Sequence, residues 1–317
     1  LATIKKAIDK HNYPLWWGNS TCLFRRRGYM DNKSYQQLAR TFLRLSRFSH
    51  LSAIASWDMF AMMPPGGSAA RGEALAELSV LEHQILTEPK VAQWLAAAAQ
   101  EDLNDVEQAN LREMTRLHTQ AALLPESLVE AKSLAGSRCE HAWRSQRPAN
   151  DWQGFSANLR EVVKLSREEA RLRAQVKGGS PYDALLDIYE PEMTSAQLDG
   201  LFADLKSWLP DLLNRVVVRQ SQQSLVAPVG PFPTAVQREL GLETMSVLGF
   251  DFNAGRLDIS AHPFCGGVPE DVRITTRYDE NELLSALFGV IHETGHARYE
   301  QNLPRNWLGQ PVALARS

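Results

Sequence analysis

The 317-residue sequence has no long apolar run, few cysteines and no excess of either charge. No stretch approaches the ~20 consecutive apolar residues of a membrane-spanning helix, so we expect no membrane partner. The 34 basic and 37 acidic residues give a formal net charge of -3, which argues against a nucleic acid as partner. The three cysteines, Cys22, Cys139 and Cys265, form no CxxC motif. These absences favour a reduced, cytoplasmic setting.

The apolar residues that are present recur mainly with helical spacing. From Tyr35 to Leu51 they lie three and four positions apart, which predicts an amphipathic helix. Segments rich in helix formers follow, separated by Pro and Gly breakers: 71–86, 91–99, 106–121, 126–145 and 152–176. With 44% hydrophobic and 22% charged residues, the sequence indicates a soluble, mainly α-helical protein with a large core.

After Leu240 the pattern indicates a small β-sheet. Two short apolar segments, 250–252 and 257–259, flank a turn, and residues 272–278 alternate between apolar and polar. The polar face of this sheet would carry Arg273, Thr275 and Arg277. A strand of this kind can hold an extended peptide, with the arginines available for a carboxylate. Alternatively, each arginine is solvated or paired with Asp258, Glu270 or Asp271.

Residues 1–29 differ in pattern from the remainder of the chain. They show neither a helical nor a strand period, whereas the helical pattern begins at Met30. We interpret 1–29 as a leader, native or non-native, and keep open the alternative of an irregular N-terminal arm. Residues 30–317 would then form a single domain.

The most informative motif is HExxH at residues 292–296. On a helix, His292 and His296 lie on one face and can converge on a divalent metal ion, while Glu293 can reach a water held by that ion. Small residues, Ser285 and Gly289, precede the histidines on this face, and an apolar stripe lies beside it. We expect the helix to begin at a capping box formed by Asp279 and Glu282. The motif therefore predicts a metal-activated hydrolase.

Several motifs resemble those of the carboxypeptidase Taq family of metallocarboxypeptidases. They are His262-Pro263-Phe264, the run from Asp271 to Tyr278, His292 to Ala297, and Tyr299-Glu300-Gln301. Their order and spacing fit that family, and the resemblance extends over about Met30 to Ser317.

This resemblance implies a helical, neurolysin-like peptidase fold with a small sheet beside the HExxH helix, usually as a homodimer. The implied activity is release of single amino acids from peptide C-termini with broad preference. His292 and His296 would bind the metal, zinc with cobalt as an alternative, and Glu293 would act as general base. His262, Arg273 and Arg277 match motif positions expected to bind the substrate.

The sequence departs from the family in one respect. Catalytic zinc normally has three protein ligands, and the family's third is a Glu in a later His-Glu-Ser motif that these residues do not contain. Glu300 is expected to face outward. We therefore interpret 30–317 as the N-terminal and central part of the domain, lacking its C-terminal helices, with Leu287 and Ile291 partly exposed. A metallo-oligopeptidase or endopeptidase and a catalytically inactive helical fragment remain as alternatives.

Overall fold

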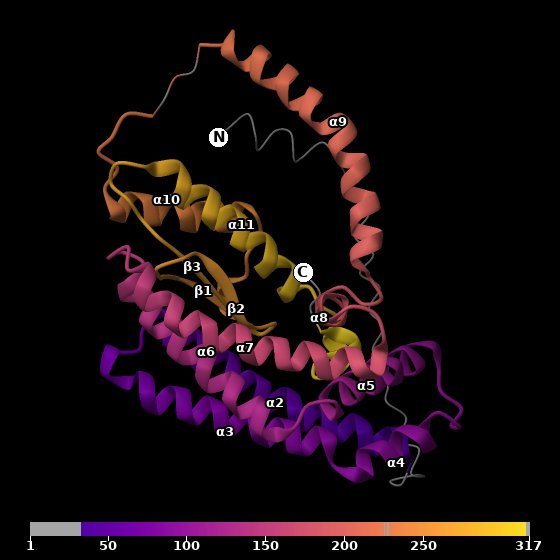
Figure 1. The fold of residues 1–317 in the computed structure, drawn as a ribbon. Coiled ribbons are helices and arrows are strands. Elements are labelled where there is room, and N and C mark those ends of the chain that lie inside the picture. The colour runs from indigo at the N-terminus through magenta and orange to yellow at the C-terminus, as the bar shows by residue number, and fades with distance from the viewer. Residues whose placement is uncertain (1–32, 225, 227, 315–317) are drawn as a thin grey trace, which may run out of the picture. The chain divides into compact units, whose positions relative to one another are not determined.

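The computed structural model describes residues 33–224, 226 and 228–314, so the expected leader, 1–29, lies outside the described residues. These residues are predominantly helical and include one three-stranded sheet (Figure 1). The predicted fold class, mainly α with a small sheet next to the HExxH helix, is confirmed. None of the described helices is long and apolar enough to cross a membrane.

The first part of the described chain is a series of antiparallel and crossing helices. They are α2 (Ser34–Ala61), α3 (Ser68–Thr87), α4 (Pro89–Ala98), α5 (Asp105–Ala122), α6 (Glu126–Gln146), α7 (Trp152–Lys177) and α8 (Pro181–Tyr189), with a 3-10 turn, η1, at Pro65–Gly67. The helices predicted from spacing are confirmed, five of them to within three residues at each end, whereas α2 extends ten residues beyond the predicted end at Leu51. One core forms where Leu38 and Phe42 of α2 meet Val91 of α4 and Met114 of α5.

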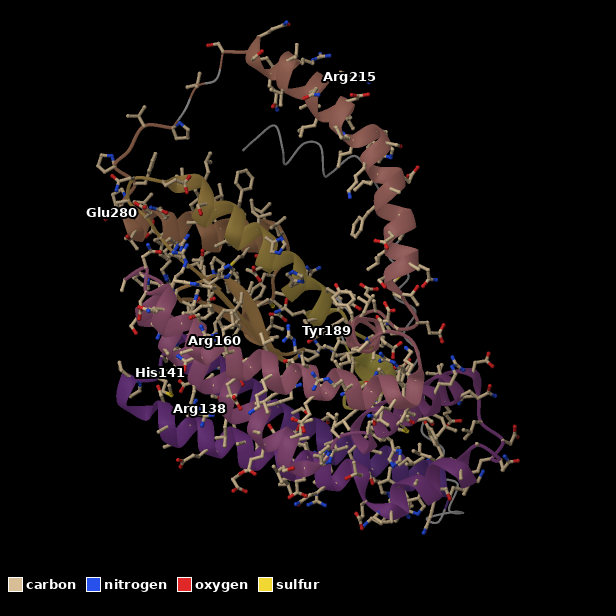
Figure 2. The ribbon with its side chains drawn as sticks, in the orientation of Figure 1. Arg138, His141, Arg160, Tyr189, Arg215 and Glu280 are labelled. Carbon is tan, nitrogen blue, oxygen red and sulfur yellow. The ribbon has the colours of Figure 1, made fainter. Side chains whose placement is uncertain are left out.

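Helix α9 (Ser195–Ser221) differs from these helices because it buries none of its residues. It begins at a capping box in which Thr194 and Gln197 satisfy each other's backbone amides. Several large apolar side chains, including Trp208, are exposed on it. Figure 2 shows side chains projecting along its length, with Arg215 labelled. An apolar surface of this extent is typical of a helix that packs against another protein segment.

The sheet has the order β1-β3-β2 and follows α10 (Thr234–Val247). Strand β1 (Gly255–Ile259) pairs in parallel with β3 (Asp271–Thr276), and β2 (Phe264–Val268) pairs antiparallel with β3. The strand expected at 250–252 is wrong. There Asp251 accepts a hydrogen bond from the Asn253 amide, which closes a 3-10 turn, η2, at Phe252–Ala254.

The HExxH motif lies in α11 (Leu283–Gln301), which packs against β3 and α10 (Figure 1). Its start was predicted wrongly. Glu282 is itself the N-cap and accepts hydrogen bonds from the amides of Leu284 and Ser285. Asp279 instead accepts from Asn281 in a preceding turn, so the helix begins three residues later than expected.

The apolar stripe of α11 lies away from the sheet. Phe288 and Ile291 are exposed, and Leu287 is partly exposed, as expected from the sequence. The residues that α11 buries against the sheet include Val290 and Ala297. The helix therefore has a second apolar face that the described residues do not cover.

The chain after α11 returns to the helices at the beginning of the chain. It contains two 3-10 turns, η3 (Arg305–Trp307) and η4 (Pro311–Ala313). The fully buried Asn110 of α5 donates to Tyr35 Oη and Gln310 Oε1 and accepts from the Val312 amide. Since an unpaired buried amide is costly, these three bonds favour one position for this segment.

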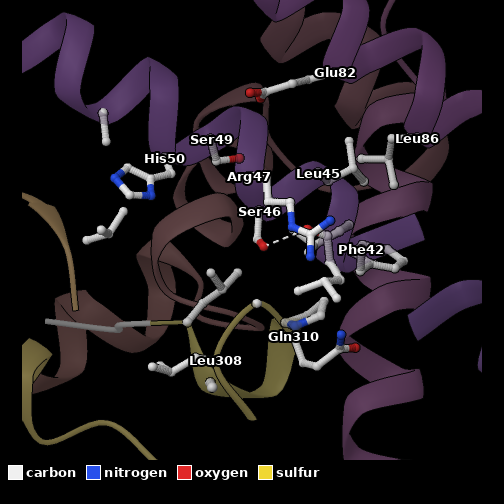
Figure 3. Close-up of a pocket in the computed structure, with 18 of the residues that line it drawn as sticks. Phe42, Leu45, Ser46, Arg47, Ser49, His50, Glu82, Leu86, Leu308 and Gln310 are labelled. Carbon is white, nitrogen blue, oxygen red and sulfur yellow. Dashed lines mark hydrogen bonds between the residues drawn. The ribbon is translucent and has the colours of Figure 1, made fainter. Parts of the chain in front are cut away.

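A cavity of about 930 Å³ lies between this returning segment and helices α2, α3 and α5. Figure 3 shows Glu82 at the top of the cavity and Leu308 and Gln310 below. One carboxyl oxygen of Glu82, Oε1, is buried and has no hydrogen-bond partner. Burial raises the pKa of Glu82 from 4.5 to about 7.

Glu82 should make the stability of the protein depend on pH. Because its pKa is higher in the folded state, its favourable contribution is complete below pH 4.5 and is lost as the pH rises toward 7. We expect the Tm of the wild type to fall over this range by more than that of Glu82→Gln, which cannot ionise. Calorimetry at each pH measures the difference. Equal falls in the Tm of the two proteins would contradict the prediction. The other titratable groups lining the cavity are present in both proteins and so do not account for a difference: Arg47, His50, His83, Arg173, Glu270 and Glu300.

Candidate metal centre

The two histidines of the motif form a pair on one face of α11. Their Nε2 atoms lie 3.3 Å apart, with ring centroids separated by 4.9 Å and an interplanar angle of 80°. A zinc ion at ~2.0–2.1 Å from both nitrogens would subtend an angle of about 110°, close to the tetrahedral value. His292 and His296 therefore fit two positions of a tetrahedral metal site, as their spacing predicts.

The described residues supply no third ligand to this pair. No group of three or more His, Cys, Asp or Glu side chains in the described ranges could hold a metal ion. Glu300 does not face outward as expected; it is half-buried and lines the large cavity. Burial raises its pKa, while the nearby His296 acts in the opposite direction. Glu300 therefore lies close to the histidine pair without completing a ligand group.

Glu293 is buried on the side of α11 that faces the sheet, next to the histidine face. Its neighbour there is Cys265 of β2: burial, together with the charges of Glu293 and Glu300, raises the pKa of this thiol to about 12. The thiol is thus protonated and neutral at physiological pH. Sequence reasoning did not connect Cys265 with the site, because its segment lacks the alternation typical of a strand.

Arg273 lies on the opposite face of the sheet from α11. Val272 and Ile274, its neighbours in β3, pack against α11, and alternate strand residues point to opposite faces. Arg273 is held by Asp271, with Nε and Nη2 at 2.9 Å and 2.7 Å from its two carboxyl oxygens. Its guanidinium also stacks on Trp57 of α2 at 4.5 Å. The pairing with Asp271 was the alternative retained in the sequence analysis.

His262 lies in the connection between β1 and β2, and Arg277 follows the last residue of β3. His262 is exposed, and its Nδ1 donates to the Pro263 carbonyl oxygen at 2.7 Å. Pro263 contacts α11 beside Gly289, where an added Cβ would lie 3.5 Å from the proline ring. Arg277 is exposed directly after β3. Their roles in substrate binding stay predictions.

His262 also lines a smaller cavity of about 360 Å³. Three aromatic side chains, Phe60, Trp143 and Phe264, share this cavity, and the rings of Phe60 and Phe264 meet edge to face. The residues that line this cavity come from α2, α6, the connection between β1 and β2, and the start of β2.

Comparisons with known proteins identify similar metallocarboxypeptidases. The model of the carboxypeptidase Taq (M32) metallopeptidase family matches residues 37–317. Thermostable carboxypeptidase 1 of Thermus thermophilus is 38% identical over 88% of this chain and 57% of its own length. Carboxypeptidase 1 of Bacillus subtilis is 32% identical over 82% of this chain and 52% of its own.

A solved structure, metallocarboxypeptidase 1 of Trypanosoma cruzi, is 47% identical with a TM-score of 0.80, covering 90% of this chain and 58% of that one. The chain therefore spans a little over half the length of the relatives that it matches. The matched region includes the helices, the sheet and the HExxH helix. The chain belongs to the carboxypeptidase Taq (M32) family of metallopeptidases.

Proposed function

We propose that this protein is a metal-dependent carboxypeptidase that releases single amino acids from peptide C-termini with broad preference. The observation that carries the proposal is the convergence of His292 Nε2 and His296 Nε2 at 3.3 Å within a family of metallocarboxypeptidases. Peptides would be the substrates, the protein would act in the cytoplasm, and a homodimer is the proposed assembly. An endopeptidase that uses the same histidines is the second candidate, because HExxH does not specify which bond is cut.

His292 and His296 would hold one divalent cation, zinc or alternatively cobalt. When bound, the metal supplies Lewis-acid chemistry, polarising the scissile carbonyl and making water more acidic. Glu293 would take the proton from the attacking water and pass it to the leaving amine. Its burial beside Cys265 and its position next to His292 on the same helix support this role. A proton-transfer group must lie within hydrogen-bond reach of the reacting atoms, and adjacency to a metal-binding residue favours this.

We infer that a third metal ligand comes from outside the described residues. Two histidines leave a tetrahedral site with half its positions open, whereas catalytic zinc normally has three protein ligands. The exposed apolar faces of α9 and α11 support this inference, because further protein segments would bury them. Residues 30–317 would then be the N-terminal and central part of one catalytic domain.

The choice between carboxypeptidase and endopeptidase can be tested with two peptides. In a version extended to the full length of the relatives, we expect a peptide with a free C-terminus to lose its last residue first. The same peptide with a C-terminal amide should remain intact, because it lacks the terminal carboxylate. Mass spectrometry over time identifies the products. Internal cleavage of the amidated peptide would favour the endopeptidase.

Glu293→Gln in the extended version should keep the metal but lose turnover by about 10²–10⁴-fold or more, because proton transfer is removed while the imidazoles remain. Mass spectrometry of the metal content and amino-acid release from a blocked dipeptide measure the two effects separately.

The matched controls are His292→Ala and His296→Ala. Each removes one of the metal ligands and should lose the metal as well as the activity. A fully metal-loaded histidine variant, or near wild-type turnover in Glu293→Gln, would contradict the assignment of roles.

The 317-residue chain itself should bind zinc weakly and show no detectable carboxypeptidase activity. We expect its Kd for zinc to be at least roughly tenfold weaker than that of the extended version, because one helix supplies only two ligands. Glu300→Gln should leave this Kd unchanged. Competition with a chromogenic chelator measures both values. Tight binding that depends on Glu300 would instead make Glu300 the third ligand.

A further inference from the structure

Two unsatisfied polar groups line the large cavity. Among the described residues, six buried side-chain nitrogen or oxygen atoms have no hydrogen-bond partner. Only Glu82 Oε1 and Gln120 Nε2, of these six, belong to residues that line the 930 Å³ cavity. The oxygen can accept a hydrogen bond and the nitrogen can donate one. Leaving both unpaired costs free energy, so a molecule that satisfies them is bound with a corresponding advantage.

The two groups come from neighbouring parts of α3 and α5. His83, next to Glu82, hydrogen-bonds the backbone of Leu124, which is four residues after Gln120. Gln120 is also fixed from α7, because Arg173 Nη1 donates to its backbone carbonyl at 3.1 Å. These contacts link α3, α5 and α7 around the acceptor and the donor.

The same cavity reaches the helix of the candidate metal centre. Glu300 lines it, and Glu300 lies four residues after His296 and interacts with it electrostatically. The turn between β2 and β3, Gly267 to Glu270, lines the cavity as well. Apolar side chains such as Phe42 and Leu86 form much of the remaining wall. A volume of this size is typical of sites for drug-sized ligands and can hold a short peptide segment.

We propose that this cavity binds the part of the peptide that precedes the scissile bond, with Glu82 and Gln120 pairing with the backbone N–H and C=O of one of its residues. The peptide N–H would donate to Glu82 Oε1, and the peptide C=O would accept from Gln120 Nε2. Each residue of an extended peptide presents its N–H donor and C=O acceptor on the same side, which matches the two unsatisfied groups. Its side chains would contact the apolar wall, where a hydrocarbon surface gives little selectivity. This proposal rests on the proposed function only in taking a peptide as the substrate.

Binding can be measured without any catalysis. The probe is a dansyl-labelled hexapeptide of alanine and leucine with a C-terminal amide, titrated into the metal-free chain in the presence of a chelator and followed by fluorescence anisotropy. We expect Glu82→Leu and Gln120→Leu each to weaken binding roughly tenfold or more, because each leaves one peptide group unpaired. Glu77→Leu, an exposed site on the same helix, should bind as the wild type does.

Thermal unfolding distinguishes this role from a structural one. Because Glu82 and Gln120 leave polar atoms unpaired, leucine at either position should keep or raise the Tm while the peptide affinity falls. A fall in both quantities would indicate lost packing and overturn the proposal, as would unchanged peptide affinity in both leucine variants. Failure of the metal chemistry would leave these measurements unaffected, since they use metal-free protein.

A series of peptides with single ester replacements locates the contact. Replacing the amide that donates to Glu82 with an ester removes its N–H and should weaken binding to the wild type at one position only. The same ester should have little effect on Glu82→Leu, because the partner is already absent. The proposal would be overturned if no ester position showed this dependence on Glu82. It would also be overturned if the probe did not bind at all.

Discussion

The packing of α11 on β3 determines where His292, Glu293 and His296 lie. Val290 and Ala297 are buried against Val272 and Ile274, and this contact fixes the rotation of the helix about its axis. Since successive helix positions differ by about 100°, burying this face turns Glu293 toward the sheet and the histidines to one side. The distance of 3.3 Å between the imidazole nitrogens then follows from helical geometry and needs no further constraint.

The face of the sheet turned away from α11 contacts α2. The guanidinium groups of Arg256 and Arg273 lie over the ring of Trp57 in α2, at 5.6 Å and 4.5 Å from its centroid. Each arginine is held by its own aspartate, Asp258 or Asp271. Arginine donates hydrogen bonds in the plane of its guanidinium group and stacks the face of that group on aromatic rings, so both contacts coexist. This arrangement links α2 to the sheet and thereby supports the surface on which α11 rests.

Buried carboxylates in this protein fall into two classes. Burial opposes ionisation of Glu169, but hydrogen bonds from Lys132 and Arg173 more than offset it, and the pKa of Glu169 is lowered. Glu82 is also removed from water, yet no cation opposes the effect, and its pKa rises to about 7. The paired carboxylate of Glu169 is what a stable core requires. The carboxyl group of Glu82 instead leaves one oxygen without a hydrogen bond in a large cavity. This contrast separates a structural carboxylate from a candidate binding group.

The sequence alone determined the local features of this protein. Spacing and breakers placed most of the long helices to within a few residues, although α2 extends ten residues beyond its predicted end. His292 and His296 were paired because the helical period brings positions four apart together. It did not determine which groups meet across the chain. The stacking of Arg273 on Trp57, the proximity of Cys265 to Glu293 and the inward position of Glu300 depend on contacts between distant elements. Strand β1 likewise pairs with β3, and the atoms of Glu82 and Gln120 become buried without partners, only when separate segments pack. The physical reason is that burial and hydrogen-bond satisfaction depend on the folded arrangement and not on any one segment.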